Sequence, residues 1–232
     1  DPIAIEIIRF CDFLDSPNIK IPMSLSDDLS SIVSIQDQSY PIYVGWGILS
    51  KLLDILNDRK FSSTIFLISD ESVLVHTRKI QILLESNGVK FHTFRIPSGE
   101  RSKNLNLVKS IYQWLAELNA ERSDMILGLG GGVVGDISGF VAATYLRGIK
   151  FAQIPTTLLA MTDSSIGGKT GVDLSEGKNL VGVFHQPEFV LADLETLETL
   201  KQRELNSGWA ESIKHGLILD KCLFNDMKNN SS

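Results

Sequence analysis

The sequence predicts an α/β fold: a Rossmann-like, mostly parallel sheet in an N-terminal domain, followed by the start of an all-α C-terminal domain. Three observations support this prediction. Short apolar runs of strand length alternate with stretches in which apolar residues recur every three or four positions. A glycine-rich turn lies between one of these runs and the helical stretch after it. Beyond residue 200 the spacing is helical.

The predicted elements follow one another closely from residue 40. A strand is expected where a short apolar run is bounded by turn residues, and a helix where the apolar period is close to 3.6. In chain order the expected elements are a strand at 40–45, a helix at 48–56, a strand at 64–69, a helix at 75–84, a strand at 91–96, a helix at 105–118, strands at 125–129 and 151–154, and mostly helix over 195–220.

The chain divides into three parts at the sequence level. Residues 1–37 are an unassigned N-terminal extension or linker, and the Ser- and Asp-rich stretch within them is typical of a loop. Residues 38–200 carry the alternating strands and helices. Residues 201–232 read as the beginning of a helical domain.

The composition excludes several classes of function. Of the 232 residues, 43% are hydrophobic and 22% charged, which is typical of globular proteins. No apolar run approaches the roughly 18 residues of a membrane span, so we expect no membrane partner. The formal charge of −6 argues against nucleic-acid binding.

The strongest motif is the glycine loop after the strand at 125–129. Gly130, Gly132 and Gly135 have the G-x-G-x-x-G spacing that dinucleotide-binding turns use. Glycines let the backbone approach a pyrophosphate, and the N-terminus of the next helix offers free N–H groups. The acid usually found about 20 residues further on is missing here, because no acid lies between Asp136 and Asp163. A tight turn with close helix packing therefore remains an alternative.

A second glycine-rich segment, 163–170 (DSSIGGKT), nearly matches a P-loop. Asp163 replaces the first glycine, and its carboxylate would repel a phosphate, so we do not expect a nucleotide triphosphatase. Lys169 can still place an ammonium group beside an anionic ligand. We therefore expect a polar pocket between the two glycine-rich turns.

Glu211, Lys214 and His215 lie at i, i+3 and i+4 of a predicted helix, and hence on one face. Glu211 and His215 together could bind a metal, and Lys214 could bind an anion. A salt-bridged surface explains the same spacing. Two ligands do not complete a zinc site, which takes three protein groups and an open position.

A series of segments in the same order resembles 3-dehydroquinate synthases. The resemblance extends from about Tyr40 to Asp220. Its segments are 130–136 (GGGVVGD), 144–148 (TYLRG), 153–160 (QIPTTLLA), 162–172 (TDSSIGGKTGV), 177–187 (GKNLVGVFHQP), 197–200 (LETL), 203–205 (REL) and 208–214 (GWAESIK).

This resemblance implies a cytoplasmic, homodimeric enzyme of the shikimate pathway, which leads to chorismate and the aromatic amino acids. It implies a tightly bound NAD and a divalent metal, zinc or cobalt. The implied reaction is the conversion of 3-deoxy-D-arabino-heptulosonate 7-phosphate, a phosphorylated sugar acid, into 3-dehydroquinate and phosphate. Residues 38–200 would then be the NAD-binding domain, and residues 201–232 would begin the metal- and substrate-binding domain.

The resemblance also assigns individual residues. It implies that the NAD-binding residues are Asp70, Ser98, Gly99, Glu100, Lys103, Gly132, Val133, Val134, Gly135, Asp136, Thr156, Thr157, Lys169, Lys178, Thr196, Leu197, Glu198 and Thr199. It implies that Arg147, Asp163, Lys169 and Lys214 are catalytic residues facing the substrate. Glu211 would be a metal ligand, whereas His215 does not match a ligand position of the family.

We expect this chain alone to be inactive. The family takes two further metal ligands, both histidines, from a helical domain of about 100 more residues. Glu211 without them cannot hold a catalytic metal, although NAD binding should survive. Release of phosphate from the heptulosonate phosphate by the purified chain would contradict this prediction.

Three other functions remain compatible with these residues. One is another sugar-phosphate cyclase, such as a 2-deoxy-scyllo-inosose or valiolone synthase. The second is a metal-dependent polyol dehydrogenase of the same superfamily, against which residues 163–171 and 177–179 argue. The third is a non-catalytic module that binds NAD or forms dimers.

Overall fold

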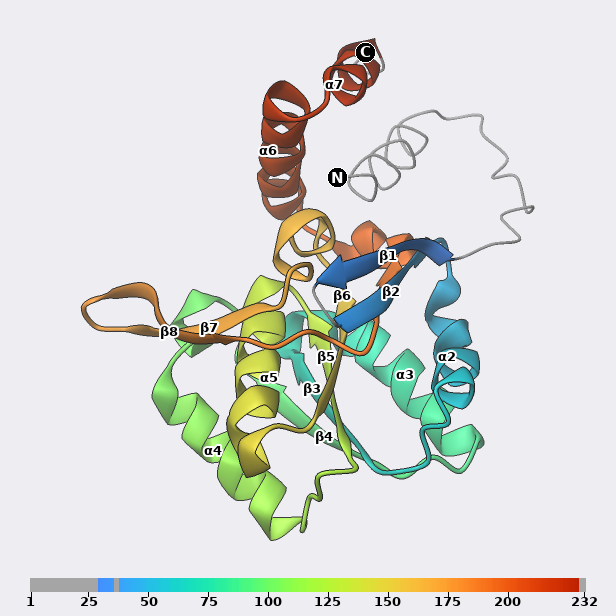
Figure 1. Ribbon diagram of the computed structural model, residues 1–232, viewed down its shortest axis with the longest axis vertical. Helices are drawn as coiled ribbons and strands as arrows, with labels where there is room; N and C mark the ends of the chain where they lie inside the picture. The colour runs from blue at the N-terminus through green and yellow to red at the C-terminus, as the bar shows by residue number, and fades with distance from the viewer. Residues whose placement is uncertain (1–28, 36–37, 230–232) are drawn as a thin grey trace.

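The computed structural model describes residues 29–35 and 38–229, and it confirms the α/β class. One seven-stranded sheet forms its centre, with helices on both faces (Figure 1). In spatial order the strands are β1 (Leu29–Ile35), β2 (Gln38–Gly45), β9 (Val190–Asp193), β6 (Lys150–Pro155), β5 (Met125–Gly130), β3 (Ile65–Asp70) and β4 (Phe91–Ile96). Only the β1–β2 pair is antiparallel.

Helices cover both faces of the sheet because its strands bury both sets of alternating side chains. Ile65 and Leu67 of β3 face a cluster that includes η1 (Ile48–Lys51), α2 (Leu52–Asp58) and α3 (Leu74–Ser86). Phe66 and Ile68 point to the other face, onto α4 (Leu105–Glu117) and α5 (Gly132–Thr144). Continuous apolar runs of this kind are typical of buried parallel strands.

The strand order places a switch point between β3 and β5. The chain passes from β3 outward to β4, and then returns across β3 to β5 and continues in the opposite direction. In open α/β sheets, ligands bind outside the carboxyl ends of the strands at such a point. The glycine loop after β5 and Asp70 at the end of β3 flank it.

Strand β1 corrects one prediction. The Ser-rich stretch before residue 38 was interpreted as loop or linker, but residues 29–35 pair with β2 as an antiparallel edge strand. A central strand would have shown a stronger apolar pattern, whereas an edge strand can keep polar residues. The rest of the predicted extension, residues 1–28 and 36–37, lies outside the described residues.

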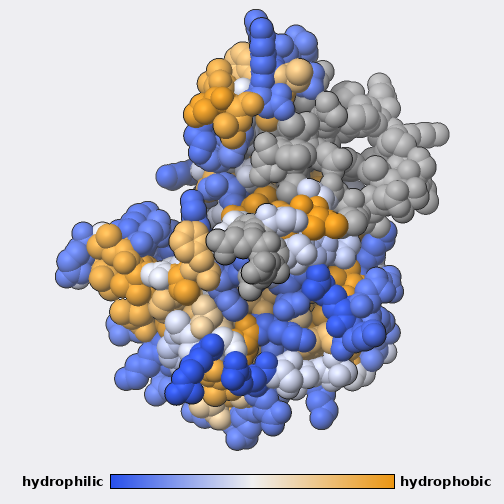
Figure 2. Space-filling view, in the orientation of Figure 1, coloured by the Kyte–Doolittle hydropathy of each residue, from blue (hydrophilic) through white to orange (hydrophobic). Residues whose placement is uncertain are grey.

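A β-hairpin, β7 (Lys169–Leu174) and β8 (Gly177–Phe184), was not predicted. Lys169 begins a strand, whereas a P-loop lysine begins a helix, so the structure also excludes the P-loop. Gly171 and Gly182 let the hairpin strands approach, because a Cβ on Gly182 would lie 2.4 Å from the carbonyl oxygen of Thr170. Figure 2 shows apolar side chains exposed along this projecting hairpin, among them Leu180 and Phe184.

Helices α6 (Gln202–Ile218) and α7 (Lys221–Asn229) extend away from the sheet (Figure 1). Gly208 lets α6 pack closely, because a Cβ there would lie 2.5 Å from the Cβ of Leu158. Trp209 packs against Leu223 and Met227 of α7. The helical spacing predicted from residue 195 onward is therefore confirmed. No helix in the described part of the chain has the length and apolar content needed to cross a membrane.

Candidate functional site

The glycine loop joins β5 to α5 and leaves the first N–H groups of the helix without a side-chain cap. Gly130 lies so close to Val134 that a Cβ would come within 2.5 Å of its Cγ2 atom. Val134 itself is fully buried in the core, so only its backbone can reach a ligand. Val133, Gly135 and Gly132 belong to the same first turn. The loop therefore has the open N–H groups that bind a phosphate.

Thr156 and Thr157 follow β6, directly beside this loop. The Thr156 N–H donates to the Gly130 carbonyl at 3.0 Å, which joins the two turns. The buried Thr156 hydroxyl has no partner among the described residues. The Thr157 hydroxyl accepts from the Ala160 N–H at 3.1 Å and so begins a π-helical turn, η5 (Ala160–Ser164). The Thr156 hydroxyl is thus free to bind a ligand.

Lys103 and Asp136 form a buried ion pair at this edge of the sheet. Lys103 Nζ lies 2.5 Å from Asp136 Oδ2 and 2.5 Å from Asn179 Oδ1. Burial raises the pKa of the Asp136 carboxyl, although the hydrogen bond and charge of Lys103 act against this rise. Glu100 and Lys178 make an exposed ion pair, 2.9 Å apart. The segment before α4 is thus joined to α5 by the Lys103–Asp136 pair and to β8 by the Glu100–Lys178 pair.

The ends of β3 and β4 bring a further group together. Asp70 Oδ1 accepts from the Ser72 N–H at 2.8 Å and from the Ser72 hydroxyl at 2.5 Å. The same N–H donates to the Ser98 hydroxyl at 3.1 Å. Gly99 has a φ of 99°, a conformation that favours glycine. Asp70, which is expected to bind NAD, therefore lies at the switch point, and Ser72 binds only its Oδ1 atom.

The remaining expected cofactor residues form a short 3-10 turn after β9, η6 (Leu194–Thr199). Thr196 and Leu197 are buried, whereas Glu198 and Thr199 are exposed. The fully buried Asp193 precedes the turn. Because β5, β6 and β9 are parallel, this turn and the glycine loop both lie at the carboxyl ends of the strands.

A cleft of about 480 Å³ lies beside the start of α5. It is lined by residues of η5, the start of α5 and the hairpin, among them Asp136, Asp163, Lys169 and Asn179. Lys169 is exposed at its rim. The polar pocket expected between the two glycine-rich turns therefore has a counterpart in the structure.

Asp163, Glu211 and His215 lie together where α6 meets η5. One ligand atom of each lies within 4.8 Å of the others. Glu211 Oε1 lies 3.2 Å from His215 Nε2 and also contacts Lys214 Nζ, which raises the pKa of Lys214. The geometry leaves both ring nitrogens of His215 without a hydrogen bond to the described residues. Two carboxylates and an imidazole are a donor set that suits a divalent metal.

Arg147 is not brought to this site. It lies between the C-terminus of α5 and the start of β6, at the amino ends of the parallel strands, whereas the glycine loop lies at their carboxyl ends. Thirteen residues of α5, about 20 Å of helix, separate that loop from the arginine. Leu146 and Arg147 have φ values of 49° and 64°, and Gly148 completes this tight turn. Within one chain, Arg147 therefore lies away from the glycine loop, and its contact with the substrate stays a prediction.

Three residues outside the expected set of site residues contact members of that set: Asn179, Asp193 and His76. Asp193 had a local signal, because an Asp before a helical turn is a typical N-cap. Nothing in the sequence indicated that Asn179 would contact Lys103, because only the hairpin brings them together.

The sequence comparisons agree with this geometry. Residues 93–207 match the family model described as 3-dehydroquinate synthase N-terminal. A 3-dehydroquinate synthase of Symbiobacterium thermophilum is 47% identical over 192 residues, which are 82% of this chain and 53% of that protein. One of Dictyoglomus thermophilum is 46% identical over 200 residues, 86% of this chain and 54% of that protein. The chain thus spans about half the length of these curated relatives.

Several solved structures share this architecture, among them two sugar-phosphate cyclases. A 2-deoxy-scyllo-inosose synthase in complex with carbaglucose-6-phosphate, NAD+ and Co2+ is 30% identical, with a TM-score of 0.75 over 82% of this chain and 52% of that one. The 2-epi-5-epi-valiolone synthase of Streptomyces hygroscopicus, with NAD+ and Zn2+ bound, is 30% identical, with a TM-score of 0.77 over 87% and 56%. An iron-containing alcohol dehydrogenase of Thermotoga maritima, 16% identical with a TM-score of 0.64, shares the fold alone.

Proposed function

Because this chain belongs by sequence to the 3-dehydroquinate synthase family, we propose that it forms the NAD-binding part of such an enzyme. The proposed reaction converts 3-deoxy-D-arabino-heptulosonate 7-phosphate into 3-dehydroquinate and phosphate. Residues 38–200 bind NAD in this proposal, joined by the edge strand β1, and residues 201–232 begin the metal- and substrate-binding domain. The family resemblance also supports a homodimer that works in the cytoplasm.

One observation carries the NAD proposal: the unpartnered, buried hydroxyl of Thr156 lies beside the uncapped glycine loop at the switch point of the sheet. A buried hydroxyl without a partner is unfavourable in the free protein, and a bound ligand can satisfy it. Asp70 and the turn at Ser98–Gly99 lie on the other side of the switch point. The residues present therefore fit a dinucleotide bound across this edge.

The donor set at α6 and η5 supports a divalent metal held by Glu211. Asp163 and His215 lie within reach of the same ion, and Gly208 makes this possible by letting α6 approach η5. Lys214 already neutralises part of the charge on Glu211. In this proposal the three groups lie around the metal position, while the family resemblance implies that two further histidines complete the ligand set.

In the proposed reaction, bound NAD supplies reversible hydride transfer and the metal supplies a Lewis acid. The chain's own residues bind and orient the substrate. In this proposal Lys169 and Lys214 neutralise the carboxylate and phosphate of the sugar acid. Asp163, which lines the same cleft as Lys169 and lies near enough to Lys214 to affect its pKa, accepts hydrogen bonds from the substrate hydroxyl groups. This arrangement would fix the open chain in a reactive pose.

Other sugar-phosphate cyclases are the second candidates, since their structures share the fold at 30% identity. The 47% identity to 3-dehydroquinate synthases favours the first proposal. A polyol dehydrogenase has less support, because the dehydrogenases with this fold are 16–18% identical.

Replacing Thr156 with valine tests the NAD proposal. We expect the Kd for NAD to rise about tenfold, because the cofactor loses one buried hydrogen bond. We also expect the free energy of unfolding to stay the same or to rise, because valine removes an unpaired buried hydroxyl. Isothermal titration of the 232-residue chain with NAD, combined with urea unfolding, measures both quantities.

Ser138→Ala is the matched control. Ser138 is also buried with an unpaired hydroxyl, but it lies in the middle of α5, away from the loop. It should change stability in the same direction and leave the Kd unchanged. Equal NAD affinity in the wild-type chain and Thr156→Val, or no binding by the wild-type chain, would contradict the proposal.

A further inference from the structure

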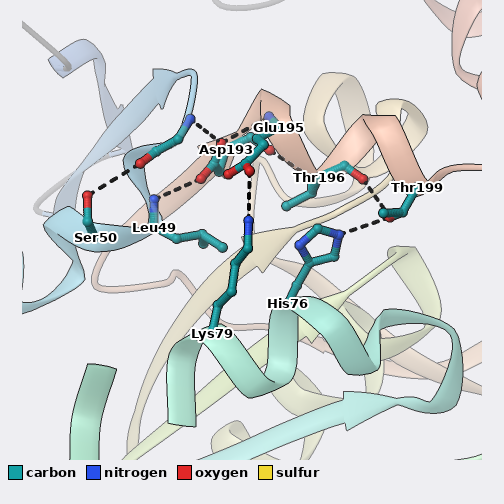
Figure 3. Close-up of polar contacts among 9 residues, drawn as sticks. Leu49, Ser50, His76, Lys79, Asp193, Glu195, Thr196 and Thr199 are labelled. Atoms are coloured by element: carbon teal, nitrogen blue, oxygen red, sulfur yellow. Dashed lines mark hydrogen bonds and ion pairs between the residues drawn. The ribbon is translucent and has the colours of Figure 1, made fainter. Parts of the chain in front are cut away.

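Helix α3 holds the cofactor turn η6 at two points (Figure 3). Lys79 Nζ lies 2.7 Å from Glu195 Oε1 near the start of the turn. His76 Nε2 lies 2.9 Å from Thr199 Oγ1 at its end. The Lys79 contact is exposed, whereas His76 is 2% exposed. His76 thus makes the more protected of the two contacts.

The hydrogen bonds around Thr199 define which ring nitrogen of His76 carries a proton. The Thr199 hydroxyl donates its proton to the Thr196 carbonyl at 3.0 Å, so it must accept from His76. The imidazole therefore carries a proton on Nε2. Its Nδ1 atom is buried and has no partner among the described residues. A neutral imidazole with one proton satisfies this geometry.

The start of the turn does not depend on His76. The Thr196 hydroxyl donates to the Asp193 carbonyl at 2.7 Å, and Asp193 Oδ1 accepts from the Glu195 N–H at 3.0 Å. These bonds fasten the first residues of η6 to β9. Thr199 follows them on the exposed side, and its contact with His76 joins this end to α3.

We propose that His76 is a positioning residue for cofactor binding, which holds Thr199, and with it the Thr196–Thr199 turn, in the conformation that contacts NAD. This inference rests on the proposed function. It adds a residue that touches the turn rather than the cofactor. Loss of the contact releases one end of η6, so the cofactor must order that end when it binds.

Acid should weaken the same arrangement, because a protonated His76 would bury a positive charge and a second N–H group without an acceptor. Burial lowers the pKa of His76, and Lys79 lowers it further, while Asp193 and Glu195 act in the opposite direction. A second proton would go to Nδ1, where no acceptor lies within the described structure. Because the folded pKa lies below the unfolded value of about 6.5, the contribution of His76 is complete above that pH and is lost as pH falls.

The test compares His76→Leu and His76→Gln in the 232-residue chain. Leucine removes the donor, whereas the glutamine amide can still donate to Thr199. We expect His76→Leu to raise the Kd for NAD about tenfold and to speed hydrogen exchange of the amides at 194–200. Glutamine should restore both, and it should remove the weakening of NAD affinity that the wild-type chain shows as pH falls below about 6.5.

His92→Leu is the matched histidine control, because His92 lies on β4, stacked against Phe66 and away from the turn. It should leave NAD affinity and the exchange at 194–200 unchanged. Unchanged affinity or unchanged exchange in His76→Leu would overturn the inference. If the wild-type chain binds no NAD, the proposed function fails. The exchange measurement then decides separately whether His76 fixes the turn.

Discussion

Replacing Lys103 with methionine should lower the free energy of unfolding by about 3–5 kcal/mol at neutral pH, the usual effect of removing one partner of a buried ion pair. The Lys103 side chain is 6% exposed and that of Asp136 19%. Methionine fills a similar volume but leaves the Asp136 carboxylate without its counter-charge. The Asn179 amide oxygen loses its donor as well. Urea unfolding followed by circular dichroism measures the change.

The loss should be smaller in acid. Burial already raises the pKa of Asp136 against the effect of Lys103, so without Lys103 the carboxyl should take up a proton more readily. A protonated carboxyl no longer needs the counter-charge. The double variant Lys103→Met with Asp136→Leu should therefore recover much of the lost stability, as replacement of whole buried pairs often does.

Lys178→Met is the control for charge removal alone. Lys178 pairs with Glu100 at 2.9 Å, but its side chain is 70% exposed. Water screens this pair, so its removal should leave the unfolding midpoint nearly unchanged. Equal losses in Lys103→Met and Lys178→Met would show that burial does not set the strength of the first pair.

Asp193→Ala should lower the free energy of unfolding by about 3 kcal/mol or more, since each buried N–H left without a partner costs roughly 1–3 kcal/mol. The fully buried Asp193 carboxylate accepts from the N–H groups of Gly47 at 2.7 Å, Leu49 at 2.8 Å and Glu195 at 3.0 Å. It thereby fastens η1 and η6 to the end of β9 (Figure 3). Thermal and urea unfolding give the size of the loss.

Asp220→Ala separates this effect from the loss of an ordinary helix cap. Asp220 accepts from the N–H groups of Cys222 and Leu223 at the start of α7, near the surface. Its removal should cost about 1 kcal/mol, the usual value for an N-cap. A loss at Asp193 no larger than that at Asp220 would contradict the role of burial.

The pH dependence of Asp193→Asn gives a second measure of this carboxylate. Burial raises the pKa of Asp193, although the N–H groups of Leu49, Glu195 and Gly47 act against the rise. Between the unfolded value of about 3.9 and the raised folded value, the folded state binds more protons. The wild-type chain should therefore lose stability as pH rises through this window. Asparagine cannot ionise, so the advantage of the wild type should be largest in acid.

Much of the fold was accessible from local patterns. The runs at 64–69 and 125–129 became β3 and β5, because a parallel strand buried on both faces needs a short, continuous apolar segment. The run at 91–96 became β4, an edge strand that is only partly buried. The glycine loop could be predicted from the sequence as well. Its contact between Gly130 and Val134 leaves no room for a Cβ, so the position requires glycine. The edge strand β1 and the exposed hairpin escaped prediction because their strands do not bury both faces.

The features of the candidate site also fall into two groups: those that the local sequence indicated and those that only the fold brought together. Periodicity, the glycine spacing and the resemblance of residues 130–214 to one family identified the class of fold and the family, because each depends on residues close together in the chain. Only the tertiary structure placed Asp163 beside Glu211 and His215, paired Lys103 with Asp136, and set Arg147 at the opposite edge. Which side chains meet, and at which end of a strand, depends on the path of the chain across the sheet, and no local pattern contains that path.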